Sequence, residues 1–174
     1  MTLVFQYGSN MSVARLNSND RLDGDAKTIG ITRTAESFEL MFTVWSKTNN
    51  CAAADLVPSK IGRSVYGVVY DIPYFLLSRD TAEKHNRKSL DAIEGEGMNY
   101  VRTPIELVKT DGSRFSAITY VAKDRKPDLK TTLSYVRHIL AGLKEHDIPN
   151  EYYQYVQSQI IENNGELEQA LLEM

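Results

Sequence analysis

Hydrophobic and polar residues follow patterns that predict several strands in the first two thirds of the chain. Residues 3–7 are an apolar run that fits a buried strand, and residues 37–44 carry an apolar side chain at every second position, as in a strand with one buried face. Residues 64–72 combine β-branched and aromatic residues and end at a proline, which also predicts a strand. Residues 100–108 and 115–122 flank an Asp-Gly turn and predict a hairpin.

Shorter and later segments complete the predicted order of elements. The small residues 51–56 fit a short strand packed closely against a neighbour, and the polar stretch 17–25 predicts a loop. Residues 74–94 have helical character broken by a polar patch, and apolar residues recur at helical spacing over 129–144 and again after residue 149. This order indicates an α+β fold: a mixed, barrel-like β-sheet with flanking helices.

Composition and charge narrow the classes of function. The 174 residues are 42% hydrophobic and 25% charged, which predicts a single globular domain over residues 1–174. A net charge of −3 argues against nucleic acid as a partner, and neither a membrane span nor a secretory signal is expected. The single cysteine, Cys51, and three scattered histidines argue against a transition-metal site and favour a cytoplasmic location.

Residues 7–11, Tyr-Gly-Ser-Asn-Met, join the first predicted strand to a helical turn that Ser12 is expected to cap. Such a connection leaves backbone N–H groups unpaired and aimed at one point, which favours binding of an anion. The loop lacks the repeated glycines of nucleotide-binding loops, so a carboxylate fits it better than a pyrophosphate. Taken alone, these residues are more often a simple strand end with a helix cap.

Residues 90–97, Leu-Asp-Ala-Ile-Glu-Gly-Glu-Gly, place acidic residues at the end of a short apolar helix. The helix dipole disfavours negative charge there and raises the pKa of a carboxyl group, more so within apolar walls. Glu94 is therefore a candidate general acid/base, although a helix that ends in solvent is the commoner meaning of this pattern. No motif for a nucleophilic serine or cysteine occurs, and His85, His138 and His146 are expected on the surface.

The two segments together resemble the γ-glutamylcyclotransferase family. Residues 7–11 resemble its Tyr-Gly-Ser-Asn loop at the end of the first strand, and residues 90–95 resemble its Leu-Asp-x-x-Glu-Gly segment. Each motif is weak by itself, but several in the same order make a specific signal over about residues 3–155. The further matches lie at residues 38–42, 65–70, 100–102 and 148–152.

The resemblance implies a cofactor-independent, amide-cleaving reaction that yields 5-oxoproline. The α-amino group of a γ-glutamyl compound would attack its own γ-carbonyl, with Glu94 as general acid/base and no metal. The loop N–H groups would hold either the substrate's α-carboxylate or the oxyanion. Three tyrosines would line the pocket, although each is nearly as typical of a core. The implied substrate-binding residues are Tyr7, Gly8, Ser9, Asn10, Met11, Tyr100 and Tyr120.

Two departures from the family pattern affect the expected site. Gln6 stands where the family often has a small residue, so the packing of the strand or the pocket floor is expected to differ. Residues 79–88 are longer and more basic than expected. Their cations could meet an acidic substrate, although a solvated charged face is the commoner explanation.

Alternative functions remain open from the sequence. The same chemistry could remove a γ-glutamyl protecting group from a biosynthetic intermediate, or the fold could serve as a non-catalytic binding or interaction module. A carboxylate in an apolar pocket argues against the module, because a pure binder has no use for it. The expected partner is a small-molecule γ-glutamyl substrate, and the oligomeric state, a homodimer included, is left open.

Overall fold

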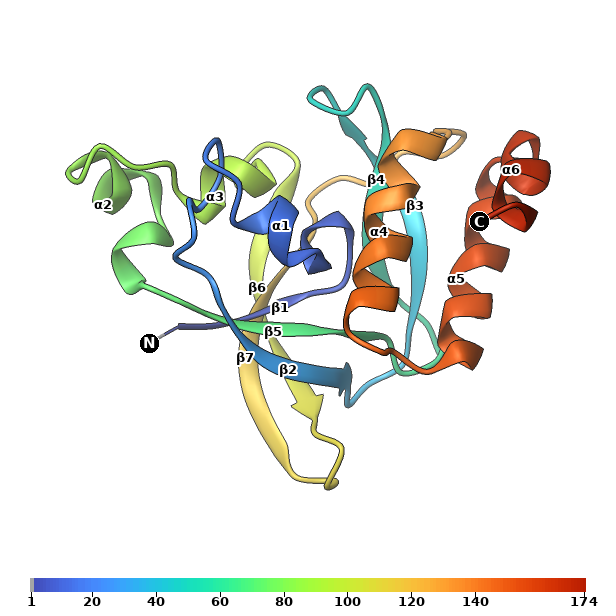
Figure 1. The fold of residues 1–174 in the computed structure, drawn as a ribbon, viewed down its shortest axis with the longest axis horizontal. Coiled ribbons are helices and arrows are strands. Elements are labelled where there is room, and N and C mark those ends of the chain that lie inside the picture. The colour runs from blue at the N-terminus through green and yellow to red at the C-terminus, as the bar shows by residue number, and fades with distance from the viewer. Residues whose placement is uncertain (1) are drawn as a thin grey trace.

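A five-stranded barrel forms the centre of the structure, a computed structural model that describes residues 2–174. The barrel strands follow the closed order β1-β5-β2-β6-β7, and β3 and β4 form a separate two-stranded ribbon beside them (Figure 1). The predicted α+β class with a mixed, barrel-like sheet is therefore confirmed. The strands are β1 (Thr2–Gln6), β2 (Lys27–Thr34), β3 (Phe38–Ser46), β4 (Cys51–Pro58), β5 (Tyr66–Ile72), β6 (Tyr100–Val108) and β7 (Arg114–Ala122).

The barrel closes at β1. This strand pairs antiparallel with β5 and meets β7 in parallel at Val4↔Ile118. Because β1 has a neighbour on each side, its residues Val4 and Phe5 are fully buried. The polar loop that follows β1 therefore leaves directly from the core of the barrel.

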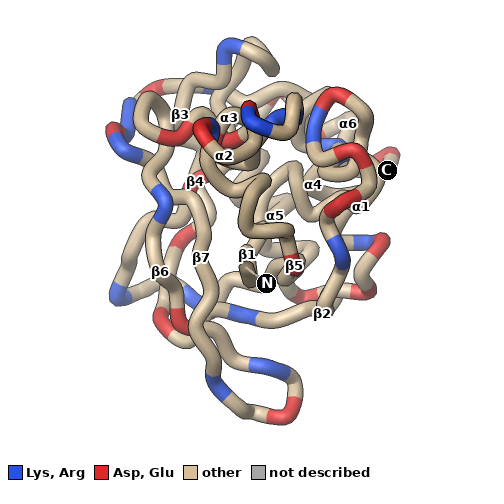
Figure 2. The backbone as a smooth tube through the Cα atoms, turned by 90° about the vertical axis from the view of Figure 1, so that its left-hand side faces the viewer, with Lys and Arg blue, Asp and Glu red and all other residues tan. Residues whose placement is uncertain are grey.

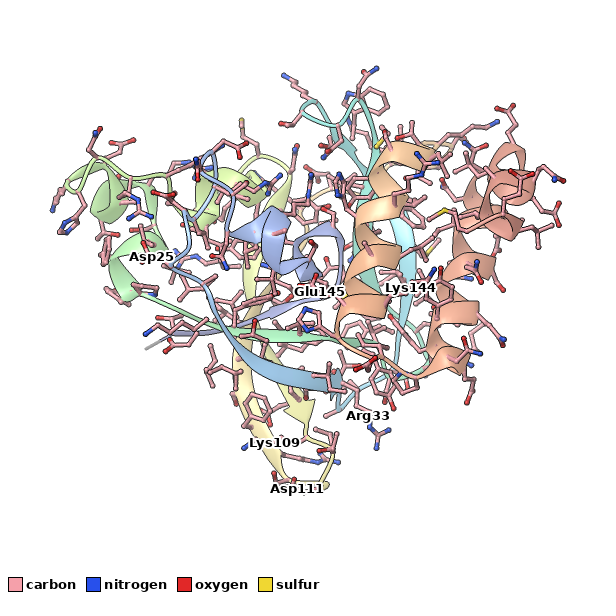
Figure 3. The ribbon with its side chains drawn as sticks, viewed as in Figure 1. Asp25, Arg33, Lys109, Asp111, Lys144 and Glu145 are labelled. Carbon is pink, nitrogen blue, oxygen red and sulfur yellow. The ribbon has the colours of Figure 1, made fainter. Side chains whose placement is uncertain are left out.

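The longer helices stand beside the ribbon and one end of the barrel (Figure 1). α4 (Leu133–Glu145) contacts the loop after β1, and Glu145 accepts a hydrogen bond from the Val13 N–H at the start of α1 (3.3 Å; Figure 3). Gly142 allows the close contact, because a Cβ there would lie 2.7 Å from the Cβ of Met11. The other helices are α1 (Val13–Leu16), α2 (Arg79–Glu83), α3 (Leu90–Glu94), α5 (Asn150–Asn163) and α6 (Glu168–Leu172).

Gly67 lies in the middle of β5, where the sequence predicted a bulge or a close approach. The structure shows the close approach: a Cβ at this position would lie 2.4 Å from the carbonyl oxygen of Gln6 and 2.6 Å from the ring of Phe5. The β2–β5 pairing does contain a shift in register, but it lies between Thr28 and Gly30 of β2, whereas Gly67 pairs with Thr32. Gly67 is therefore required by the packing of β5 on β1.

Two elements differ from the sequence-based expectation. The sequence does not predict β2, because its first half is exposed and the strand lacks a sustained alternation of apolar and polar residues. Pairing with β5 and β6 gives these residues their strand geometry. The helix expected from residue 129 begins only at Leu133. The preceding backbone is held by α5, since the side chain of Asn163 bonds to the Thr131 N–H and the Leu129 carbonyl (both 2.8 Å).

Charged residues lie mainly on loops and outer faces (Figure 2). The tip of the β6–β7 hairpin, with Lys109 and Asp111, projects on the side opposite to α1 and α3 (Figures 1 and 3). Within residues 2–174, none of the helices combines the length and apolar character needed to cross a membrane. The same part of the chain contains no group of three or more His, Cys, Asp or Glu side chains placed to hold a metal ion.

Candidate active site

The loop after β1 and the end of α3 meet in space, although Asn10 and Glu94 lie 84 residues apart in the sequence. Asn10 Nδ2 donates a hydrogen bond to Glu94 Oε1 (2.8 Å), and Gln6 Nε2 donates to the same oxygen (3.0 Å). Across the described residues, Glu94 Oε2 has no hydrogen-bond partner. One carboxylate oxygen is thus held in place and the other is available to a ligand.

The position of α3 is fixed by Asp91, three residues before Glu94. Its buried carboxylate accepts a hydrogen bond from Tyr120 Oη on β7 (2.7 Å) and forms an ion pair with Arg102 Nε on β6 (3.1 Å). Gly95 ends the helix in a left-handed conformation with φ of 70°, which favours glycine. The Leu-Asp-x-x-Glu-Gly segment therefore anchors a short helix to the barrel through Asp91, places Glu94 at its last residue and ends it at Gly95.

The loop after β1 turns as a single 3-10 helix, Ser9–Met11, in which the Met11 N–H donates to the Gly8 carbonyl (3.0 Å). The N–H groups of Ser9 and Asn10 have no acceptor within residues 2–174, as expected for the first turn of a helix. Both residues are buried and line the same pocket as Glu94. Their N–H groups are available to an anionic or carbonyl oxygen.

Two adjoining cavities surround Glu94. The inner pocket has a volume of about 30 Å³, room for about one water-sized group. The outer cleft has a volume of about 430 Å³ and shares Ser9, Asn10, Glu94, Tyr100 and Tyr135 with the inner pocket. The remaining inner residues are Gln6, Tyr7, Gly8, Ala54 and Tyr120, and the outer cleft adds Arg15, Arg21, Ser46, Lys47, Thr48, Asn49, Ala53, Ala92, Ile93, Gly95, Met98 and Asn99.

Tyr7, Tyr100 and Tyr120 all line the inner pocket. Each hydroxyl donates within the protein: Tyr7 to the Tyr120 carbonyl (2.6 Å), Tyr100 to the Ala54 carbonyl (2.7 Å) and Tyr120 to Asp91. Burial raises the pKa of all three hydroxyls, which keeps them protonated. The tyrosines therefore form fixed walls, with their donor protons already engaged.

Met11 lies outside both cavities, unlike the four residues before it. Its side chain is fully buried beside Gly142, and its carbonyl accepts a hydrogen bond from Tyr70 Oη (2.7 Å). The same carbonyl lies 2.9 Å from His146 Nε2. His146 is therefore half-buried and bound to this loop, whereas the sequence predicted a surface residue.

Tyr135 and Ala54 belong to the site although the sequence does not mark either residue as functional. Tyr135 lines both cavities from α4, and its hydroxyl accepts a hydrogen bond from the Ala54 N–H on β4 (3.0 Å). Nothing in the sequence marks Tyr135, because it occupies an ordinary buried position of an amphipathic helix. The sequence marks Gln6 only as a departure from the family pattern, and in the structure its side-chain amide donates to Glu94 Oε1.

The pKa of the Glu94 carboxyl is raised above its usual range, chiefly because the group is buried. Hydrogen bonds from Asn10 and Gln6 and the positive charges of Arg21 and Arg15 act in the opposite direction and limit the rise. The direction agrees with the sequence-based expectation, and burial is its main cause. A carboxyl group of this kind can exchange a proton closer to neutral pH than an exposed glutamate.

The basic segment at residues 79–88 lines neither cavity. Arg79 Nη2 donates to the carbonyl of Asp91 in α3 and to that of Glu96 just after the helix. Arg87 forms an ion pair with Asp25 (2.7 Å), and Lys88 donates to the Asp20 carbonyl in the same loop as Asp25. These contacts attach α2 and its following turn to neighbouring loops. Contact with an acidic substrate at this site is therefore not supported.

Solved structures with a similar fold include three that span about nine tenths of this chain. A protein described as a gamma-glutamyl cyclotransferase has 22% identity and a TM-score of 0.72, over 90% of this chain and 86% of that chain. An uncharacterised Homo sapiens protein has 24% identity and a TM-score of 0.72, also over 90% of this chain and 86% of that chain. YkqA from Bacillus subtilis has 19% identity and a TM-score of 0.71, over 91% of this chain and 54% of that chain. At these identities the likeness shows the fold.

Sequence comparison identifies the family. Comparison with curated protein sequences gave no significant match. A profile of the AIG2-like family matches residues 64–156, more than half of the chain. This range contains α3 with Glu94 and the two strands that hold it. The resemblance to γ-glutamylcyclotransferases is confirmed at the level of the fold. The chain therefore belongs to the AIG2-like family.

Proposed function

We propose that this protein is a γ-glutamylcyclotransferase, which converts a γ-glutamyl amide into 5-oxoproline and a free amine or amino acid. The observation that carries the proposal is the placement of Glu94. Its carboxyl group has a raised pKa, and one of its oxygens is held by Asn10 and Gln6. The other oxygen has no partner within residues 2–174, and Glu94 shares its pocket with Ser9 and Asn10.

The reaction needs a group that first accepts a proton and then returns it. Glu94 takes a proton from the substrate's α-amino group as that nitrogen attacks the γ-carbonyl carbon. The N–H groups of Ser9 and Asn10 stabilise the oxyanion that forms, or hold the α-carboxylate. The bond from the γ-carbon to the amide nitrogen then breaks, and Glu94 gives its proton to the departing nitrogen.

The cavities suit an intramolecular attack. Both reacting groups belong to one glutamyl chain, so the protein need only hold that chain folded back on itself. The inner pocket has room for one water-sized group, such as a carboxylate or a carbonyl oxygen. The remaining glutamyl atoms and the leaving group then lie in the outer cleft.

Assay of 5-oxoproline tests the proposal. The protein is incubated with γ-glutamyl amino acids, peptides, amines and a γ-glutamyl-protected amine, and products are separated by chromatography. Wild-type protein should release 5-oxoproline and amine in equal amounts, and Glu94→Gln should lower turnover by about 10²- to 10⁴-fold. Normal turnover by Glu94→Gln would overturn the role of Glu94, and no product from any compound would favour the non-catalytic binding module.

Location and assembly stay predictions. The single cysteine, Cys51, is buried in β4, which suits a reducing cytoplasm. Sedimentation velocity would distinguish a monomer from the homodimer that the sequence left open.

A further inference from the structure

The outer cleft carries positive charge that no carboxylate within residues 2–174 pairs with. Arg15, Arg21 and Lys47 line it, and the proposed catalyst Glu94 is the one acidic residue in its lining. Within residues 2–174 neither arginine forms an ion pair. Positive charge in a cleft attracts anionic ligands and raises their local concentration.

Arg15 has unused hydrogen-bonding capacity. Its Nη2 donates to the Asn49 side-chain oxygen (3.1 Å), but its Nε is buried and has no partner in the described structure. A buried donor without an acceptor is unfavourable. Burial and the positive charge of Arg21 both lower the pKa of Arg15, the direction expected for a buried cation with a second cation nearby. A bound anion would give the guanidinium of Arg15 an acceptor and would offset the repulsion between the positive charges of Arg15 and Arg21.

Arg21 connects the positively charged side of the outer cleft to Glu94 through Asn10. Its Nη1 donates to Asn10 Oδ1 (2.9 Å), and the Asn10 amide nitrogen donates in turn to Glu94. Arg21 therefore borders the reacting centre, and its remaining N–H groups have no recorded acceptor in residues 2–174. A carboxylate close to the scissile nitrogen would lie within the same part of the cleft.

We propose that Arg15, together with Arg21, binds a carboxylate on the leaving group, so that the substrate is a γ-glutamyl amino acid and best one with an acidic side chain. This inference rests on the proposed γ-glutamylcyclotransferase function. The α-carboxylate of a leaving amino acid is two bonds from the scissile nitrogen, and the planar guanidinium binds carboxylates through two parallel hydrogen bonds. A second carboxylate would meet the remaining charge of Arg21 and Lys47.

The test compares three substrates that differ in charge on the leaving side: γ-glutamyl-glutamate, γ-glutamyl-alanine and γ-glutamyl-alaninamide. With wild-type protein, kcat/KM should fall in that order, and the acid should exceed its amide by about 10- to 100-fold. Raised salt should narrow the difference. Equal kcat/KM for the acid and the amide would overturn this inference and leave the cyclotransferase function intact.

Variants assign the effect to Arg15. Arg15→Gln should lower kcat/KM for γ-glutamyl-alanine by about 10- to 100-fold, mainly through KM, and bring the ratio of acid to amide close to one. Arg15→Lys should retain part of the preference, because it keeps the charge and loses the fork. Lys60→Gln, an exposed cation that lines neither cavity, is the matched control and should retain the wild-type ratio. Circular dichroism establishes that each variant is folded.

Binding separates failure of this inference from failure of the proposed function. Calorimetry with Glu94→Gln protein measures affinity for γ-glutamyl-alanine and for its amide without turnover. Tighter binding of the acid that disappears in the Glu94→Gln, Arg15→Gln double variant supports the carboxylate site even if no 5-oxoproline is formed. Equal affinity for acid and amide contradicts it.

Discussion

Glu94 is controlled by side chains that touch only one of its oxygens. Gln6 and Asn10 donate to Oε1, and Arg21 holds the other end of the Asn10 amide. These donors favour the ionised carboxylate, whereas burial favours the protonated form. The balance between the two effects sets the pH at which Glu94 can act as a base.

Replacing Gln6 with leucine should move the pH profile of the reaction. The variant loses one donor to the ionised carboxylate, so the pKa of Glu94 rises further and the base form is lost at a higher pH than in the wild type. The acid limb of kcat/KM, measured against pH, should therefore shift upward. Gln154→Leu, an exposed glutamine of α5, should leave the limb in place. A limb that is unmoved or moves downward in Gln6→Leu would contradict the role of Gln6.

Replacing Glu94 with glutamine should stabilise the protein at alkaline pH while strongly lowering turnover. Because the folded-state pKa of Glu94 lies above its unfolded value, ionisation costs stability as the pH rises through the folded-state pKa. Glu94→Gln removes that cost, so its free energy of unfolding in urea should exceed that of the wild type at pH 8. The difference should disappear below the ordinary glutamate pKa of about 4.3. A less stable variant at pH 8 would show that the charge is well compensated.

At the scale of elements, glycines decide how closely the site's supports can pack. Gly67 lets β5 lie against the end of β1, where Gln6 begins the site, and Gly142 lets α4 lie against the loop that carries Asn10. In both cases the neighbour is backbone or a fully buried side chain, which has little room to move. β5 is thus in direct contact with the end of β1, and α4 is in direct contact with the loop that follows it.

Gly142→Ala tests this packing. Alanine favours a helix interior by about 1 kcal/mol, but its Cβ would lie 2.7 Å from the Cβ of Met11 and 3.0 Å from the Ser12 nitrogen. Overpacking of this kind costs about 1–3 kcal/mol, so we expect lower stability in denaturant and lower kcat/KM from a displaced loop. Gly165→Ala, which has no atom within 4 Å of its Cβ, is the control. An unchanged kcat/KM in Gly142→Ala would show that the loop absorbs the shift.

At the scale of the whole molecule, the ribbon and the barrel are joined by buried polar contacts. Asp55 of β4 is fully buried, accepts a hydrogen bond from the Ala122 N–H of β7 (2.8 Å) and pairs with Arg125 Nε (2.6 Å). Tyr100 of β6 donates to the Ala54 carbonyl. Because the inner pocket is lined from both parts, the ribbon must stay attached for the site to exist.

Unfolding should therefore be a single cooperative transition, as the sequence-based prediction of one domain requires. Trp45 is the one tryptophan of the chain and lies on the ribbon strand β3, so its fluorescence reports on the ribbon, whereas far-UV circular dichroism reports on all elements. The two signals should give the same urea midpoint. An earlier transition in the fluorescence would show that the ribbon unfolds separately.

The sequence by itself determined most elements and their order. Alternation over residues 37–44, the Asp-Gly hairpin turn and the glycine that ends α3 are local signals, because strand period, turn chemistry and helix capping depend on neighbouring residues. β2 lacked such a signal, and its strand geometry depends on partners distant in the sequence. α4 begins at Leu133 and not at residue 129, because a side chain of α5, Asn163, holds the preceding backbone.

For the site, the sequence supplied the candidate residues and the tertiary structure decided which of them meet. The loop motif and Glu94 are each recognisable in the sequence. Only closure of the barrel at β1 brings Asn10 and Glu94 together, so that Asn10 Nδ2 lies 2.8 Å from Glu94 Oε1 although the residues are 84 positions apart. The same folding moved Met11 into the core and brought in Tyr135 and Arg15, which carry no local signal of function. Contacts between distant segments depend on how the whole chain packs, and no periodicity within one segment records them.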